Sequence, residues 1–261
     1  MPPDWGANAI LYPYRKPSVG SPHIPYEPIA FAGEGGIALR GWRFPAQGPR
    51  RGTLVYLHGV ADNRTGGVGL AKRFGPKGWD VIAYDGRAHG ASGGTVCTYG
   101  ALEKRDLVRA LDAAQADRVI LFGSSLGAAV ALQAAPLDPR IRGVIAQSPF
   151  SSLPEIARDR APWFATEAEV GQALAIAQAK GGFTLGEASP VAAARDIHVP
   201  VLLIHGERDR DTRPEHSRRI ESSLAGPKRL LIVPGAGHYD TLRGEEVWGE
   251  IERWLEVLPL G

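Results

Sequence analysis

One serine stands where a strand is expected to turn directly into a helix. The segment Gly-Ser-Ser-Leu-Gly at 123–127 follows the apolar run 119–122 and opens a run of small apolar residues up to 135. So sharp a turn presents the hydroxyl of Ser125 at its tip, and the flanking glycines relieve the crowding. The N-terminus of the helix offers N–H groups and a favourable dipole to a developing oxyanion. The pattern predicts that Ser125 is a nucleophile that attacks a carbonyl carbon.

A carboxylate and a histidine follow two later strands and suit the activation of a serine. Asp209 comes after an apolar run that ends at 204, and His238 lies in a glycine-rich loop after the last such run. An imidazole can accept the serine proton, and a carboxylate can orient the imidazole and stabilise its protonated form. Asp211 is the rival for the acidic role, but Asp209 lies nearer the end of its strand. We therefore expect a catalytic triad of Ser125, Asp209 and His238.

Two other nucleophiles fit the sequence less well. Ser92 also stands in a Gly-x-Ser-x-Gly pattern, but it lies several residues beyond its strand and no helix follows it. We therefore expect Ser92 to lie in a glycine-rich surface loop. Cys97 is the single cysteine, so no internal disulfide can form. Because no histidine is placed to activate its thiol, Cys97 is interpreted as a small loop side chain.

Backbone N–H groups next to the serine are expected to bind the oxyanion. Gly59 follows the apolar run 53–57, and a glycine at this point allows the next N–H to face the site. The N–H groups of Val60 and Leu126 are therefore the predicted oxyanion donors.

Other polar residues also follow the expected strands, and we interpret them as structural. His58, His89 and His205 are expected to form hydrogen bonds to neighbouring loops. Asp85 is expected to organise its own loop, with Arg87 as its ionic partner.

The elements that position these residues follow from the apolar pattern. Short continuous apolar runs indicate strands that are covered on both faces. They lie at 28–32, 37–44, 53–57, 80–84, 118–122, 143–146, 199–204 and 229–233, and helices are expected near 99–116, 125–135, 214–225 and 245–257. This alternation predicts one α/β domain over 1–261. Its sheet is expected to be mostly parallel and doubly wound, with about eight strands and an antiparallel N-terminal hairpin.

Two segments depart from the alternation. Residues 1–26 are rich in proline and are expected to form an extended arm. The interval from about 150 to 198 contains helical sequence and no strand pattern, which predicts a short helical lid inserted into the domain. Four aromatic residues in and beside this lid are expected to line an apolar substrate pocket: Phe150, Trp163, Phe164 and Phe183.

Composition argues against several classes of partner. The 30 basic and 28 acidic side chains give a net charge of +2 and form no basic stripe, so we expect no nucleic-acid partner. No apolar run approaches the roughly 20 residues that span a bilayer. The N-terminus lacks the basic and apolar regions of a secretory leader, and a cytoplasmic location is expected. The oligomeric state is left open.

Together the motifs resemble the α/β-hydrolase superfamily, over roughly residues 28 to 257. The order Ser125, Asp209, His238 is the order that this superfamily uses. Leu-His-Gly at 57–59, the segment 84–94 and His-Gly-Glu-Arg-Asp at 205–209 resemble more narrowly the Bem46-like and serine aminopeptidase S33-like hydrolases. The resemblance implies hydrolysis of a small-molecule acyl substrate without a metal or an organic cofactor.

The leading interpretation is a carboxylesterase that forms an acyl-enzyme on Ser125. A thioesterase or an aminopeptidase would use the same three side chains. An aminopeptidase would also need acidic groups in the lid for the substrate's free amine. Acidic residues that could serve this purpose are interpreted as solvated helix faces, such as Glu155, Asp159, Glu167 or Glu169. A ligand-binding receptor that retains the triad is a third alternative.

Overall fold

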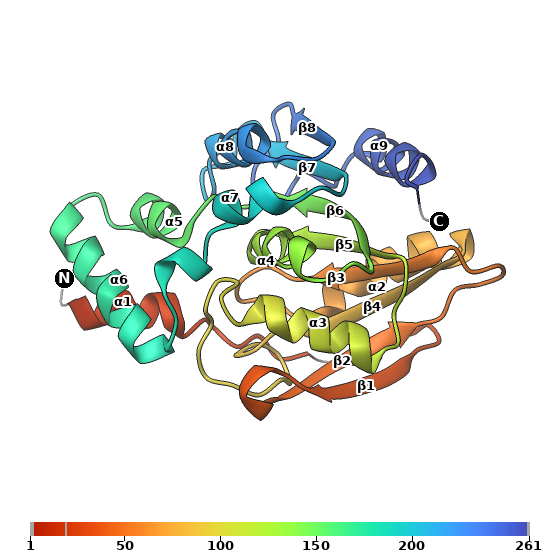
Figure 1. Ribbon diagram of the computed structural model, residues 1–261, viewed down its shortest axis with the longest axis horizontal. Helices are drawn as coiled ribbons and strands as arrows, with labels where there is room; N and C mark the ends of the chain where they lie inside the picture. The colour runs from red at the N-terminus through yellow and green to blue at the C-terminus, as the bar shows by residue number, and fades with distance from the viewer. Residues whose placement is uncertain (1–2, 19, 260–261) are drawn as a thin grey trace.

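An eight-stranded sheet forms the centre of the molecule (Figure 1). The computed structural model describes residues 3–18 and 20–259, and the strands follow the order β1-β2-β4-β3-β5-β6-β7-β8. β2 is antiparallel to both of its neighbours, and all other pairs are parallel. The strands are β1 Glu27–Ala32, β2 Ala38–Phe44, β3 Gly52–Leu57, β4 Trp79–Asp85, β5 Val119–Ser124, β6 Ile141–Gln147, β7 Val201–Gly206 and β8 Lys228–Val233. The predicted sheet and its antiparallel N-terminal hairpin are confirmed.

Helices cover both faces of the sheet. On one face lie α3 (Glu103–Ala113), α4 (Leu126–Ala134) and α8 (Glu215–Ser223), and on the other lie α2 (Gly67–Phe74) and α9 (Glu245–Glu256). Strands β3, β4 and β7 are buried along their whole length, which explains their continuous apolar sequences. The four expected helices are present. α2 was not predicted, because its glycine-rich sequence has low helix propensity and its stability comes from packing on the sheet.

The N-terminal arm is helical in its first part, and the prediction of an extended arm is wrong there. α1 spans Pro3–Leu11 and packs beside α6 (Glu167–Gly181), as Figure 1 shows. A proline is tolerated in the first turn of a helix, where its missing N–H would have no partner. Ala7 and Leu11 are fully buried, so tertiary packing stabilises this short helix. Residues 12–18 and 20–26 of the arm form no helix, and residues 1–2 and 19 lie outside the described residues.

The insertion between β6 and β7 contains three α-helices and no strand, as the sequence predicts. These are α5 (Leu153–Arg160), α6 and α7 (Pro190–Ala193). α6 begins with a capping box, in which Thr166 and Glu169 satisfy each other's backbone N–H groups. Across the described ranges, no helix is both long and apolar enough to cross a membrane.

Candidate active site

Ser125 occupies a strained turn between β5 and α4. Its φ of 51° and ψ of −111° are rarely adopted by a residue with a side chain. The N–H of Ser125 donates to the carbonyl of Gln147 at 2.8 Å, and its own carbonyl accepts from the N–H of Ala129 at 3.1 Å. These bonds hold the turn against β6 and the first turn of α4. The serine is largely buried, with 7% of its surface exposed.

Glycines allow the turn at Ser125 to approach the end of β3. A Cβ atom at Gly127 would overlap the backbone carbonyl of Leu57, and one at Gly123 would overlap the carbonyl of Gly127. At Gly59 a Cβ atom would lie 3.5 Å from the Cβ of Ser125. The turn after β3 therefore lies directly beside the serine.

The two predicted oxyanion donors lie on these adjoining turns. Val60 follows Gly59, and Leu126 is the first residue of α4. Within the described part of the chain, no acceptor takes up the N–H of either residue. Free backbone N–H groups next to a serine are suited to bind negative charge that develops on a carbonyl oxygen.

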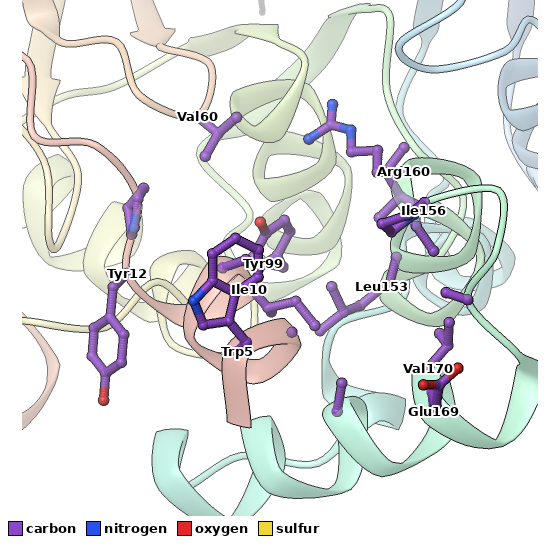
Figure 2. Close-up of a pocket in the computed structure, with 18 of the residues that line it drawn as sticks. Trp5, Ile10, Tyr12, Val60, Tyr99, Leu153, Ile156, Arg160, Glu169 and Val170 are labelled. Carbon is purple, nitrogen blue, oxygen red and sulfur yellow. The ribbon is translucent and has the colours of Figure 1, made fainter. Parts of the chain in front are cut away.

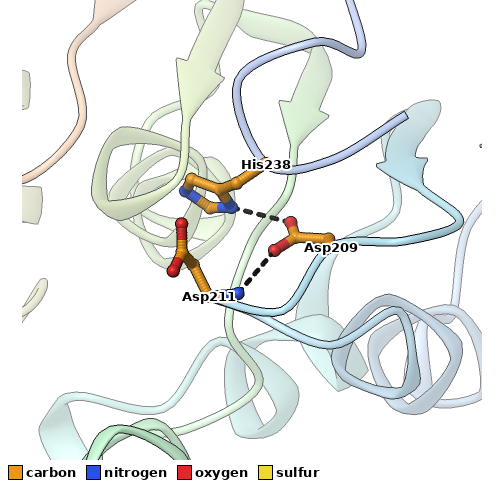
Figure 3. Close-up of side chains that lie close together, drawn as sticks. All are labelled: Asp209, Asp211 and His238. Atoms are coloured by element: carbon orange, nitrogen blue, oxygen red, sulfur yellow. Dashed lines mark hydrogen bonds and ion pairs between the residues drawn. The ribbon is translucent and has the colours of Figure 1, made fainter. Parts of the chain in front are cut away.

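Asp209 and His238 form a buried hydrogen-bonded pair (Figure 3). Nδ1 of His238 lies 2.7 Å from Oδ2 of Asp209. Oδ1 of Asp209 accepts the N–H groups of Asp211 and Thr212 at 3.0 and 2.9 Å. Because an ionised carboxylate only accepts hydrogen bonds, Nδ1 carries the imidazole proton and Nε2 is left to accept one.

The carboxyl group of Asp209 has a lowered pKa. Burial by itself raises this pKa, but hydrogen bonds from His205, His238 and the N–H of Thr212 outweigh it. Nε2 of His205 lies 2.7 Å from the carbonyl of Thr212 and 3.3 Å from Oδ2 of Asp209, so this nitrogen carries a proton. Its Nδ1 accepts from the hydroxyl of Ser217 at 2.7 Å. His205 therefore holds Asp209 in its loop, in line with its interpretation as a structural residue.

Asp211 does not take the place of Asp209. The side chain of Asp211 is exposed. Its backbone N–H, rather than its carboxylate, forms the hydrogen bond to Asp209 (Figure 3). The donor atoms of Asp209, Asp211 and His238 lie within 4.8 Å of one another. However, the 2.7 Å separation between the imidazole and carboxylate of the pair is that of a hydrogen bond. The cluster is therefore arranged as a hydrogen-bonded pair with an adjacent carboxylate, rather than as a metal cage.

A hydrogen bond links the loop of His238 to the end of β6, beside the turn of Ser125. Nε2 of Gln147 donates to the hydroxyl of Thr241 at 2.6 Å. Gln147 is also the register partner of Ser124 and accepts the N–H of Ser125. The loops after β5, β7 and β8 thus meet at the carboxyl edge of the sheet, where ligands bind in open α/β folds.

The rival nucleophiles are buried and engaged. Ser92 was expected in a surface loop, but its hydroxyl is buried, where it donates to the carbonyl of Asp85 at 2.6 Å. Oγ of Ser92 also accepts the N–H of Arg40 at 3.0 Å. Cys97 lies in the hydrophobic core, and burial raises the pKa of its thiol well above the ordinary value. Such a thiol is a poor nucleophile.

The predicted pairing of Asp85 with Arg87 is wrong. Oδ2 of Asp85 lies 3.1 Å from Nη1 of Arg64, and it also accepts bonds from Ser18 and the N–H of Ala91. Arg87 instead forms a buried, bidentate ion pair with Asp106, at 2.7 and 2.9 Å. Asp85 still organises loops as expected, but it joins the N-terminal arm to the loop after β4.

His58 and His89 have the structural roles that the sequence suggests. Nε2 of His58 accepts the N–H of Gly86 at 2.9 Å, and its Nδ1 lies 2.7 Å from the carbonyl of Gly59. Nδ1 of His89 lies 2.8 Å from the carbonyl of Arg87. Burial lowers the pKa of both imidazoles, and that of His89 is lowered to about 4. The imidazole of His58 is therefore neutral, and it holds the turn that carries Val60.

A cavity of about 500 Å³ opens beside this turn (Figure 2). Val60 and Ala61 form one part of its wall, and Tyr99 forms another. The remaining walls come from the N-terminal residues 5–14, from α5 and from α6. Most of the lining side chains are apolar, and the charged ones are Arg160 and Glu169. Volumes in this range are typical of small-molecule sites.

The four aromatic residues predicted to line a pocket do not line this cavity. Trp163 and Phe164 are 95% and 58% exposed, and their rings contact each other at the turn between α5 and α6. Phe150 is buried behind Tyr99, at 5.8 Å between ring centroids, and Phe183 is buried in the core cluster that includes Leu11. The insertion does contribute to the wall, but through smaller side chains on α5 and α6. The orientation of α5 and α6 decides which side chains face the cavity, and that orientation depends on tertiary packing.

A second row of serine, histidine and aspartate is present that the sequence does not predict. Ser151 Oγ lies 2.6 Å from Nδ1 of His216, whose Nε2 lies 3.0 Å from Oδ2 of Asp159. The N–H of Ser151 also donates to Nδ1, so this nitrogen is an acceptor. Ser151 is fully buried and has no access to a substrate. The row therefore ties α5 to α8, and the scattered sequence positions gave no signal for it.

Comparison with known proteins places the chain in a family. Residues 52–192 match the α/β hydrolase fold family. The protein Rv2307c of Mycobacterium tuberculosis is 30% identical over 87% of this chain and 78% of its own length. The protein YfhR of Escherichia coli is 29% identical over 82% of this chain and 74% of its own length. Both relatives are uncharacterized, so they show the family of this chain but not its activity.

Solved structures show the same fold. The esterase Pf2001 of Pyrococcus furiosus superposes with a TM-score of 0.76 and 24% identity, over 96% of this chain and all of the other. An acetyl xylan esterase from Paenibacillus sp. R4 superposes with a TM-score of 0.72 and 20% identity, over 98% of this chain and 92% of the other. The sheet order, the strained serine turn and these likenesses agree, and the chain belongs to the α/β hydrolase fold family.

Proposed function

We propose that the protein is a serine hydrolase that cleaves carboxylic esters through an acyl-enzyme on Ser125. The observation that carries the proposal is the buried hydrogen-bonded pair of Asp209 and His238. Asp209 follows β7 and His238 follows β8, at the same sheet edge as the strained turn of Ser125. A nucleophile, a base and an orienting carboxylate are the parts that this chemistry needs. The fold likeness to esterases is consistent with the proposal.

In the proposed mechanism, Nε2 of His238 accepts the proton of Ser125 as Oγ attacks the ester carbonyl. The carbonyl oxygen becomes an oxyanion that the N–H groups of Val60 and Leu126 stabilise. Collapse of this intermediate breaks the bond to the alkoxide, which takes the proton from His238 and leaves as the alcohol. A water molecule then attacks the acyl-enzyme with His238 as its base, which releases the acid and restores Ser125.

The ionised carboxylate of Asp209 supports both steps. Its low pKa keeps it charged at every pH at which an imidazole titrates, so it can stabilise His238 when that ring is protonated. Its second oxygen is occupied by two backbone N–H groups, which fix the orientation of the carboxylate. The imidazole is therefore presented with Nε2 away from Asp209.

Among hydrolases of this type, four acidic residues of the insertion argue against an aminopeptidase. Asp159 pairs with Arg213 and His216, and Glu155 pairs with Arg219 at 3.0 Å. The other two are engaged as well: Glu167 pairs with Arg158, and Glu169 caps α6. Residues engaged in this way do not offer a dedicated site for a substrate ammonium group. Ester hydrolysis remains our proposal over aminopeptidase activity.

A thioesterase would use the same groups, and substrate assays separate the two activities. A ligand-binding receptor is disfavoured because a strained serine and a buried acid–imidazole pair are retained together. Within the family, we also propose a place among the Bem46-like and S33-like hydrolases. The supporting residues are Leu-His-Gly at 57–59 and Asp-Gly-Arg-Ala-His-Gly at 85–90.

A fluorophosphonate probe tests the proposal directly, because it forms a covalent bond with an activated serine. We expect wild-type protein to be labelled and to hydrolyse p-nitrophenyl acetate, and Ser125→Ala to lose both properties. Ser92→Ala is the matched control, since Ser92 stands in the other Gly-x-Ser-x-Gly pattern. Labelling that persists in Ser125→Ala, or wild-type protein that is neither labelled nor active on esters, would overturn the proposal.

A further inference from the structure

The N-terminal helix α1 forms a wall of the cavity that Val60 and Ala61 also line. Figure 2 shows Trp5 and Ile10 of this helix across the cavity from Leu153 and Ile156 of α5. The cavity extends to Val60, whose N–H is the proposed oxyanion donor. A substrate whose carbonyl is bound at that N–H can therefore extend its non-reacting part along α1.

α1 is held firmly enough to act as a fixed wall. A Cβ atom at Gly6 would lie 2.9 Å from the Cβ of Ala173, so α1 and α6 are in close contact. Nζ of Lys180 on α6 lies 2.7 Å from Oδ1 of Asp4. The carbonyl of Leu11 accepts the N–H of Cys97 at 2.8 Å, which fixes the end of the helix to the body.

The chemistry of the wall selects apolar groups. The α1 residues at the cavity include Gly6, Ala9 and Ile10, and none of the cavity residues between 5 and 14 is charged. Burying hydrocarbon against such a surface is favourable in proportion to its area. α1 also lies outside residues 52–192, the part of the chain that matches the family.

We propose that α1 is a specificity-determining element, and that the cavity takes an unbranched hydrocarbon chain of the substrate. This inference rests on the proposed function for the identity of the reacting group, an ester at Ser125. Ala9 and Ile10 set the space that is available to the chain. Each methylene that enters the cavity is expected to raise kcat/KM about threefold to fourfold until the cavity is full.

Filling the cavity from α1 tests the assignment. Ala9→Trp is compared with Asn8→Trp, because Ala9 lines the cavity and its neighbour Asn8, also exposed, does not. The substrates are p-nitrophenyl esters from acetate to decanoate and alkyl acetates of the same lengths. We expect Ala9→Trp to lower the octanoate-to-acetate or octyl-to-ethyl ratio of kcat/KM about tenfold or more. Asn8→Trp should leave these ratios within about twofold of wild type.

A change that enlarges the cavity gives the opposite signature. Ile10→Ala removes three carbons from the wall, and we expect the preferred chain to lengthen by about one or two methylenes. A urea unfolding curve for each variant shows that the helix and the fold are retained. Ratios that are the same in wild type, Ala9→Trp and Ile10→Ala, all folded, would overturn the inference.

Binding without turnover separates this inference from the proposed function. Octan-1-ol and butan-1-ol are titrated by calorimetry into Ser125→Ala and into Ser125→Ala/Ala9→Trp. We expect octan-1-ol to bind at least tenfold more tightly than butan-1-ol, and the second variant to lose this preference. If the alcohols bind in this way but wild type cleaves no ester, the cavity assignment stands and the proposed function fails. The cavity assignment fails if wild type cleaves acetate esters but the preference for octan-1-ol over butan-1-ol is absent or is unchanged by Ala9→Trp.

Discussion

Nδ1 of His238 lies 2.7 Å from Oδ2 of Asp209, and both side chains are buried. The two residues are 29 positions apart in the sequence and come together because β7 and β8 are adjacent parallel strands. The neighbouring carboxylate of Asp211 is exposed and makes no hydrogen bond to the imidazole among the described contacts. This geometry distinguishes two aspartates that the sequence presents as rivals.

We expect Asp209→Asn to lower kcat/KM for p-nitrophenyl acetate by about 10³- to 10⁴-fold, because the amide can neither hold the required tautomer nor stabilise a protonated imidazole. Asp211→Asn is the matched control and should change kcat/KM by less than about tenfold. Steady-state kinetics of the two variants check the assignment. A larger loss in Asp211→Asn than in Asp209→Asn would show that the acid has been assigned wrongly.

Gly127→Ala is expected to abolish fluorophosphonate labelling and to destabilise the fold by several kcal/mol, because the new methyl group would overlap the carbonyl of Leu57. Gly171→Ala in α6 is the control, since no atom lies within 4 Å of a Cβ atom there. This second change should raise the free energy of unfolding by about 0.5–1 kcal/mol through helix propensity. Urea unfolding of both variants measures the difference, and a stable, labelled Gly127→Ala would contradict the close approach of α4 to β3.

The free energy of unfolding is expected to fall as the pH falls from 6.5 towards 4. Burial, and then the neighbouring His58, lowers the pKa of His89 to about 4, whereas an exposed imidazole titrates near 6.5. Between these values the unfolded chain binds a proton that the folded chain does not, so acid favours unfolding. His89 alone accounts for about 3 kcal/mol of this loss. Lowered pKa values of His58 and His216, with burial as the first cause, act in the same direction.

Urea unfolding between pH 7 and 4.5 measures this dependence in wild type and in His89→Asn. The asparagine amide can still donate to the carbonyl of Arg87, which Nδ1 of His89 contacts at 2.8 Å. The variant should therefore show a visibly shallower dependence on pH. Identical slopes in the two proteins would mean that His89 is not the source.

Asp106→Asn should lower the free energy of unfolding by about 3–5 kcal/mol, because it leaves the buried guanidinium of Arg87 without its bidentate partner. Lys16→Gln is the control: it breaks the exposed ion pair with Asp62 and should cost less than about 1 kcal/mol. The double variant Arg87→Met/Asp106→Leu should be more stable than Asp106→Asn, since neither charge of this pair is then left buried. Equal costs for the buried and the exposed pair would contradict this.

The sheet and the positions of the candidate reactive groups could be predicted from the amino-acid sequence. Continuous apolar runs mark strands that are covered on both faces, and residues that follow parallel strands must gather at one edge. Ser125, Asp209 and His238 were therefore placed correctly at the ends of β5, β7 and β8. These signals are local, since they need only the order of residues within one strand and its following turn.

Tertiary structure decided what these local signals leave open. α1 and α2 are helices because distant residues bury their apolar sides, although proline and glycine in their sequences argue against helices. Contacts between distant segments also paired Asp85 with Arg64, selected Asp209 over Asp211 as the partner of His238, and turned Trp163 away from the cavity. Such choices depend on helix orientation and on which segments meet in space, and neither is encoded in the spacing of nearby residues.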